Sequence, residues 1–252
     1  MPIENRHIAC PDTDAKAHIF QKLQKEILAL QGLHKPGESL RVNAGLGAVE
    51  AAFPDGVFPT GAMHEFISQG PEEAAATEGF MAGLLGGLMQ QGGFCLWVGS
   101  PLFPPALTRF GIAPEKILFV TTTRPKEILW AVEEGLRCAG LTAVVGRLQE
   151  LSFTAARRLQ LAVEQSRVTG FIHRCRPRSE NTIACVARWR IKPLPARTED
   201  ALPGVGHPRW TVQLLRARNG KPGAWQLEWA EGRFHVLPPA ATAPEVRIRK
   251  IG

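Results

Sequence analysis

The sequence predicts an α/β fold, in which a mostly parallel sheet is flanked by helices and extended by antiparallel strands on its C-terminal side. Two patterns lead to this prediction. Between residues 62 and 175, short continuous apolar runs alternate with segments of helical periodicity, which is typical of a parallel sheet covered on both faces. After residue 176, strand-like runs follow one another without intervening helices, as in antiparallel hairpins.

Each element is expected from its own local pattern. Short apolar runs predict strands, and apolar positions at helical spacing between Gly and Pro punctuation predict helices. The dipeptides Asn219-Gly220 and Glu231-Gly232 indicate hairpin turns. The expected strands of the parallel sheet span 62–67, 94–99, 116–122, 141–146 and 170–175, the helices span 72–91, 104–110, 126–139 and 152–168, and the antiparallel strands span 183–191, 209–218, 224–230 and 233–237.

Three regions are distinguished along the chain. Residues 1–40 are expected to form an N-terminal helix, over 14–31, and a linker. Residues 41–237 are expected to form the core domain. Residues 238–252 are rich in Pro and Ala and then basic, so we expect a flexible tail.

Composition excludes several classes of protein. The chain has 252 residues, of which 44% are hydrophobic, so a sizeable core can form. No apolar run is long enough to span a membrane, and the N-terminus has no apolar signal-peptide segment, so a cytoplasmic protein is expected. The five cysteines include no pair at CxxC spacing, so neither a metal site nor a disulfide framework is expected.

The net charge of +7 is unevenly distributed. Residues 1–146 carry 11 Lys and Arg against 15 Asp and Glu, whereas residues 147–252 carry 19 against 8. A basic half favours an acidic partner, of which nucleic acid is the commonest. The alternative is a basic surface that serves only solubility.

A strand followed by Gly70 and a helix is the setting of a phosphate-binding loop, in which backbone N–H groups and a lysine hold the phosphates. Here Ala75 stands where the second glycine belongs and Ala76 where the lysine belongs, and only Gly70 and Thr77 keep the pattern. Glutamates 72, 73 and 78 would repel a triphosphate. The alternative interpretation is a well-capped helix start, because acidic residues suit a first helical turn.

The other parts of an ATPase are also missing from the sequence. No glutamate follows the strand 94–99 to activate water, and Arg147 stands after the strand 141–146 where an aspartate would hold a metal. Phosphoryl transfer depends on positioning and charge stabilisation. We therefore expect no ATPase activity, no catalytic residues, no cofactor and no metal.

The order of these parts resembles the RecA recombinase core over residues 40–237, so a RecA-like fold is implied. The resemblance begins at GLGAVEAAFPDGVFPTGAMHEFISQGP (residues 45–71) and continues through SFTAARRLQLAVEQSRVTGFIHRCRP (residues 152–177). The runs TIACVARWRI and LLRARNGKPGAWQLEW resemble the antiparallel extension.

The degenerate phosphate loop, the length and the basic tail together resemble the ImuA family, RecA-related proteins that lack ATPase motifs. This implies an accessory role in SOS-induced translesion DNA synthesis and mutagenesis. The implied partners are ImuB, which is a Y-family polymerase homologue, RecA, and an error-prone DNA polymerase III alpha subunit. The alternative is a SulA-type inhibitor of cell division, which binds the tubulin-like division protein and also lacks ATPase motifs.

The resemblance also directs attention to candidate contact residues. Recombinases bind DNA through two loops, and the corresponding connections here are short. The second connection still has three positive charges within five residues, which suit phosphates or acidic protein surfaces, or are simply solvated. The N-terminal helix is expected to pack on its own core, on a second copy or on RecA. The candidates for partner or nucleic-acid contact are Arg174, Arg176, Arg178, Arg247, Arg249 and Lys250, and those for self-association are Ile19, Phe20, Leu23 and Ile27.

Overall fold

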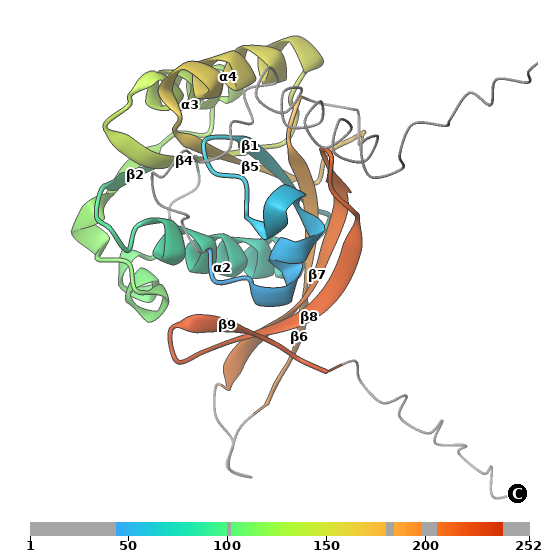
Figure 1. Cartoon of the computed structure of the whole chain (residues 1–252). Coiled ribbons are helices and arrows are strands. Elements are labelled where there is room, and N and C mark those ends of the chain that lie inside the picture. The colour runs from blue at the N-terminus through green and yellow to red at the C-terminus, as the bar shows by residue number, and fades with distance from the viewer. Residues whose placement is uncertain (1–43, 100–101, 180–183, 198–205, 239–252) are drawn as a thin grey trace, which may run out of the picture. The chain divides into compact units, whose positions relative to one another are not determined.

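The computed structural model describes residues 44–99, 102–179, 184–197 and 206–238 (Figure 1). All of them belong to the second of the chain's two units, Val42–Gly252. The strands are β1 (Met63–Ser68), β2 (Phe94–Gly99), β3 (Ile117–Thr121), β4 (Leu141–Leu148), β5 (Thr169–Cys175), β6 (Ala187–Arg197), β7 (His207–Ala217), β8 (Gly223–Ala230) and β9 (Arg233–Val236). The α-helices are α2 (Pro71–Leu88), α3 (Pro125–Arg137) and α4 (Phe153–Ser166), and the 3-10 helices are η1 (Gly47–Ala52), η2 (Pro54–Gly56), η3 (Pro104–Phe110) and η4 (Pro114–Lys116).

The strands form one nine-stranded sheet in the order β3-β2-β4-β5-β1-β6-β7-β8-β9. Strands β1 to β6 run parallel to one another, and β7, β8 and β9 add to them as an antiparallel extension. The expected fold class, a mostly parallel sheet flanked by helices with antiparallel strands at the C-terminal side, is therefore confirmed.

The direction of β6 differs from the expectation that all strands after residue 176 are antiparallel. β6 pairs in parallel with β1, on the side opposite β5. The chain therefore crosses β1 between Cys175 and Ala187 to begin β6 at the same end of the sheet as β5. The connection between parallel strands usually contains a helix. The described residues of this one, 176–179 and 184–186, form none.

The two faces of the sheet are covered differently. One face packs against α2, and the extension curves around this helix (Figure 1). The hydrophobic core between this face and α2 contains the fully buried Trp189. The ring centroids of Phe66 and Phe80 lie 6.2 and 6.1 Å from that of Trp189. The opposite face is covered by α3 and α4 over β1, β2, β4 and β5. Both faces of β1 and β5 are therefore buried, so that even their polar side chains are closed to solvent.

Glycines allow α2 to lie close to its neighbours. A Cβ atom added at Gly86 would lie 2.0 Å from the backbone oxygen of Phe110 in η3, and one at Gly83 would lie 2.5 Å from the Phe234 ring of β9. The helix therefore approaches both elements more closely than any larger residue permits.

The local signals in the sequence agree well with the observed ends of the elements. Glu231 and Gly232 both have positive φ, 52° and 72°, as the predicted two-residue hairpin turn requires. Ser152 begins α4, and its side chain accepts a hydrogen bond from the Ala155 N–H. The segment expected as a short helix at 104–110 forms the 3-10 helix η3. Among the described helices, none has the length and apolar character needed to cross a membrane.

Candidate functional site

The segment that resembles a phosphate-binding loop is a helix start in the structure. Only Gln69 and Gly70 separate β1 from α2, which begins at Pro71. The Ala74 N–H donates to the Gly70 carbonyl at 3.0 Å, and the Gln69 N–H donates to the Glu73 carboxylate at 2.9 Å. These backbone donors, which a phosphate cradle would direct at its ligand, are bonded within the protein.

The four motif positions also point in different directions. Ala75 is exposed, whereas Ala76 is buried against the core under the sheet. Thr77 is fully buried, and its hydroxyl donates to the Glu73 carbonyl at 2.7 Å, one turn earlier in α2. Gly70, Ala75, Ala76 and Thr77 are therefore parts of one regular helix start and do not line a common hollow.

A polar cluster lies at the carboxyl ends of β1, β4 and β5, where ligands of open α/β sheets usually bind. Arg147 at the end of β4 forms an ion pair with Glu78 of α2 at 2.9 Å, and its Nε donates to Cys175 Sγ at 3.2 Å. The His173 Nε2 atom lies 2.8 Å from Ser68 Oγ and 3.4 Å from Cys175 Sγ. Glu78, expected from the sequence to repel a phosphate, is thus balanced by the arginine that stands in place of a metal-binding aspartate.

The ionisation of this cluster follows from its burial. Burial raises the pKa of the Glu78 carboxyl, and the nearby Arg147 guanidinium opposes this effect. Burial, together with the nearby Arg147 guanidinium, lowers the pKa of His173 to about 3, so the imidazole is neutral at physiological pH. Its Nδ1 lies 3.7 Å from Glu78. At neutral pH the cluster is therefore one Arg–Glu ion pair beside a neutral histidine.

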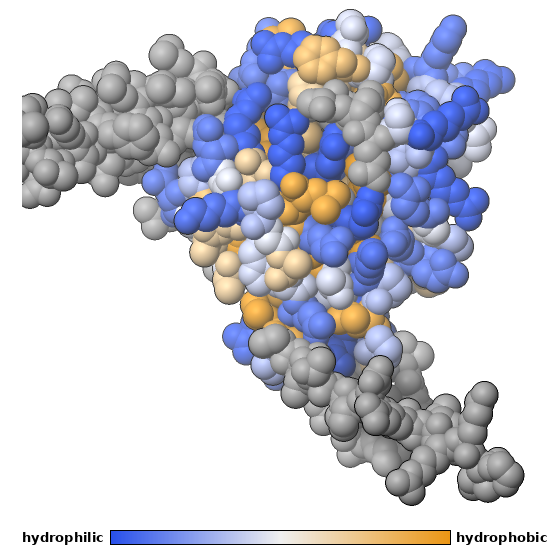
Figure 2. Space-filling view, turned by 90° about the vertical axis from the view of Figure 1, so that its right-hand side faces the viewer, coloured by the Kyte–Doolittle hydropathy of each residue, from blue (hydrophilic) through white to orange (hydrophobic). Residues whose placement is uncertain are grey.

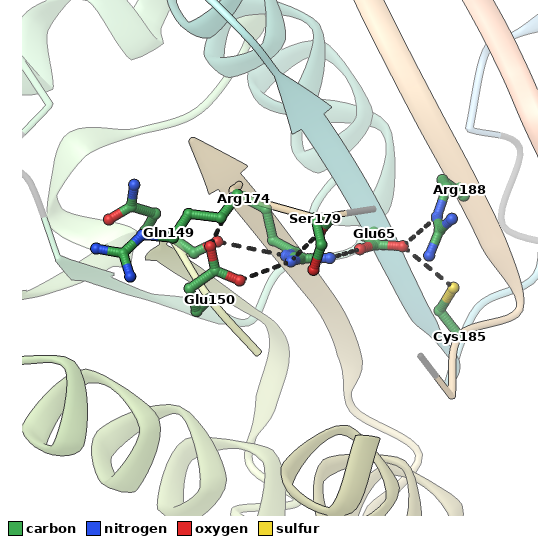
Figure 3. Close-up of polar contacts among 8 residues, drawn as sticks. Glu65, Gln149, Glu150, Arg174, Ser179, Cys185 and Arg188 are labelled. Atoms are coloured by element: carbon green, nitrogen blue, oxygen red, sulfur yellow. Dashed lines mark hydrogen bonds and ion pairs between the residues drawn. The ribbon is translucent and has the colours of Figure 1, made fainter. Parts of the chain in front are cut away.

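A second cluster surrounds Arg174, which is fully buried on β5 (Figure 3). Its guanidinium donates to Glu65 of β1 at 2.9 Å, to Glu150 at 3.3 Å and to the Ser179 carbonyl at 2.9 Å. Glu65 is also fully buried and accepts a hydrogen bond at 2.5 Å from Arg188 of β6. The triad Arg174–Glu65–Arg188 thus joins β5, β1 and β6, the three central strands of the sheet.

This burial contradicts the expectation that Arg174 is a surface contact for a partner or nucleic acid. Residues in a strand alternate between faces, and Arg174 faces the side covered by α3 and α4, as Ile172 does. Its side chain holds strands together and is closed to solvent. The loop after β5 therefore presents two of the three predicted arginines.

Arg176 and Arg178 are exposed, and their backbones anchor the loop. The Arg176 N–H donates to the Ser68 carbonyl at 2.8 Å, and its own carbonyl accepts from Gln149 at 3.0 Å. The Arg178 N–H donates to the Glu150 carboxylate at 2.7 Å. Both side chains remain candidates for contact with an acidic partner.

Other candidates lie outside the described residues, so the structure does not place them. These are Ile19, Phe20, Leu23 and Ile27 of the expected N-terminal helix and Arg247, Arg249 and Lys250 of the expected tail. In the part of the chain that the structure does describe, no group of three or more His, Cys, Asp or Glu residues could hold a metal ion.

Glu65 is the structurally important residue that sequence reasoning did not single out. The signal for it is its position in the run MHEFIS, in which every residue is buried. A carboxylate inside a buried strand requires a buried cation or donor as its partner. The sequence pattern could have indicated the need for such a partner, although not its identity.

Comparison with known proteins gives one clear similarity. No protein-family model matches the chain. The proteins named Protein ImuA from Caulobacter vibrioides strains NA1000 / CB15N and ATCC 19089 / CIP 103742 / CB 15 are each 34% identical to it over 198 residues. The matched region covers 73% of this chain and 81% of each relative.

Proposed function

Because the chain belongs to the ImuA family, we propose that it is a non-catalytic, RecA-fold accessory protein of SOS-induced translesion DNA synthesis. It acts by protein–protein interaction with ImuB, RecA or an error-prone polymerase. The observation that supports a non-catalytic role most strongly is the helical start of α2 directly after β1, with Thr77 bonded to Glu73 inside the helix.

The electrostatics of the neighbouring cluster support the same role. Catalysis of phosphoryl transfer needs cations that are directed at the phosphates. Here the guanidinium of Arg147 is 2.9 Å from the carboxylate of Glu78. A triphosphate would have to displace Glu78 from this ion pair and then lie beside its carboxylate. A site with this charge arrangement favours a structural or scaffolding role.

We expect no binding of Mg-ATP by the native chain in isothermal titration calorimetry. The Ala76→Lys variant restores the lysine of the motif in sequence, but it is also expected to show no binding. Position 76 is 7% exposed in the structure and faces the core, so the ammonium group would not reach a ligand at the helix start. Micromolar binding by the native chain would contradict the non-catalytic assignment.

The partner assignment is tested by co-purification. Tagged full-length chain, expressed in damaged cells, is expected to capture ImuB. The triple variant Arg247→Ala, Arg249→Ala, Lys250→Ala is expected to capture several-fold less ImuB, because it removes the positive charges through which the tail is proposed to bind this partner. Lys126→Gln with Arg157→Gln, two exposed cations of α3 and α4, is the control and should capture a normal amount. If the native chain captures no ImuB, the proposed function fails, whereas unchanged capture by the triple variant overturns only the role of the tail.

A further inference from the structure

The outer face of β6, β7 and β8 adjoins the Arg174 cluster at Arg188, which pairs with Glu65. On β6, the buried side chains of Trp189 and Ile191 face α2, so the alternating Arg188, Arg190 and Lys192 face the other way. This is the face that α3 and α4 cover over the parallel strands. Figure 2 views the molecule from the side of the extension and shows a surface on which hydrophilic side chains predominate.

Positive charge dominates this outer sheet face. Register with β6 places Arg216 beside Arg188, and Arg209 faces the same way further along β7. The same face of β8 contributes one carboxylate, Glu228, which lies 3.4 Å from Arg209. Within the described parts of β6, β7 and β8, five cations thus share a face with a single surface carboxylate. Glu65 neutralises Arg188 from β1, but the outer sheet face still has more positive than negative charges.

The spacing of these cations suits a chain of phosphates. Outward residues along one strand repeat about every 6.7 Å, and neighbouring strands are about 4.8 Å apart. The remaining outward positions include Thr211, Gln213 and Gln226, which pair across the strands on this face. Arg, Lys, Thr and Gln are side-chain types that commonly contact nucleic-acid backbones.

The composition also distinguishes nucleic acid from an acidic protein as the partner. Protein-binding surfaces are enriched in Trp, Tyr, Phe and Arg and depleted in Lys, and their binding hot spots are enriched in Trp, Tyr and Arg. The outward positions of β6, β7 and β8 that pair in register hold no Phe or Trp. Trp210, Trp225 and Trp229 occupy the alternate positions, whose side chains face α2. The lack of aromatic side chains on this face also argues against stacking on bases.

We propose that the outer sheet face, defined by Arg190, Lys192, Arg209 and Arg216 with Arg188 at its inner edge, is a nucleic-acid-binding surface that contacts the phosphate backbone of DNA. Binding is independent of sequence. The exposed Arg178 lies at the end of the same network, because Glu150 joins its backbone to Arg174 and Glu65 joins Arg174 to Arg188. The proposal depends on this surface and not on the proposed function.

The experiment measures binding of the full-length chain to fluorescently labelled 30-nucleotide DNA by anisotropy at several salt concentrations. Single strands and duplexes of two unrelated sequences distinguish the form of DNA preferred. The native chain is expected to bind with an affinity that falls steeply with salt and is independent of sequence. Removing two phosphate contacts should reduce the slope of log affinity against log salt by about 1.4 for single strands or about 1.8 for duplexes.

The test variant is Lys192→Gln with Arg216→Gln, since both side chains are exposed. Its affinity is expected to fall at least about tenfold near 0.1 M salt. The control is Lys126→Gln with Arg157→Gln, which removes the same two residue types from exposed positions on α3 and α4. This control should bind within about twofold of the native chain, because neither residue belongs to the outer sheet face. Thermal denaturation of both double variants checks that they fold equally well.

Three results would overturn the proposal. The first is absence of binding by the native chain at low salt. The second is an equal loss in the two double variants, which would indicate only a long-range effect of net charge. The third is competition by polyglutamate as strong as that by unlabelled DNA, which would indicate a general site for acidic polymers.

Discussion

Replacement of Glu65 with glutamine is expected to lower the free energy of unfolding by about 3–5 kcal/mol, as is typical when one partner of a buried ion pair is removed. The substitution preserves the shape of the side chain and removes only its charge. It leaves Arg174, which is fully buried, and Arg188, whose side chain is 12% exposed, without their shared anion. Glu150 remains near Arg174 at 3.3 Å, but no carboxylate replaces Glu65 between the two guanidiniums.

Urea denaturation of the native chain and the variant measures this effect. Glu134→Gln is a matched control, because Glu134 pairs with Arg137 at the surface of α3, with both side chains about half exposed. It should cost less than about 1 kcal/mol. The double variant Glu65→Gln, Arg188→Gln should lose less stability than the two single losses added together, because each single change leaves a charge uncompensated. A loss in Glu65→Gln no larger than in Glu134→Gln would show that the buried triad does not hold the central strands together.

Gly86→Ala is expected to destabilise the protein by about 1–3 kcal/mol, the usual cost of overpacking a core. Alanine in a helix interior normally stabilises by about 0.5–1 kcal/mol relative to glycine. At position 86, however, the new Cβ atom would lie 2.0 Å from the Phe110 carbonyl oxygen. Because that oxygen belongs to backbone, α2 and η3 would have to move apart.

Gly79→Ala in the same helix separates the steric effect from helix propensity. The nearest atom to its added Cβ is a Trp210 ring carbon at 3.4 Å, which is ordinary van der Waals contact. This variant should therefore be as stable as the native chain or slightly more stable. Thermal denaturation of the two variants side by side measures the difference, and equal stabilities would contradict the close approach of α2 to η3.

Much of the fold could be predicted because local patterns determine it. The run FCLWVG predicts a strand over 94–99, and β2 spans Phe94–Gly99. The direction of β6 could not be predicted in this way. An apolar run does not indicate which way its strand points, and a crossover without a helix has no periodic signal. The choice depends instead on pairing with β1, which lies far away in the sequence.

The candidate site was only partly predictable, for a different reason. Local sequence identified the missing lysine at Ala76 and the arginine at 147, and it allowed a capped helix start as one interpretation. For Arg174, the number of positive charges nearby indicated a basic loop. Its side chain is instead buried, because Arg174 belongs to β5 and both faces of that strand are covered. The partner of Glu65 could not be inferred, because Arg174 and Arg188 follow it by 109 and 123 residues.

The placement of β1 at the centre of the sheet affects how the protein is made. During synthesis, this early strand leaves the ribosome long before either of its neighbours exists. β5 and β6 contact it only after residues 169 to 197 have been translated. Until then, both hydrogen-bonding edges of β1 are unpaired, and such edges invite association with other chains. The central strand of the sheet can therefore be paired on both sides only after most of the chain has been translated.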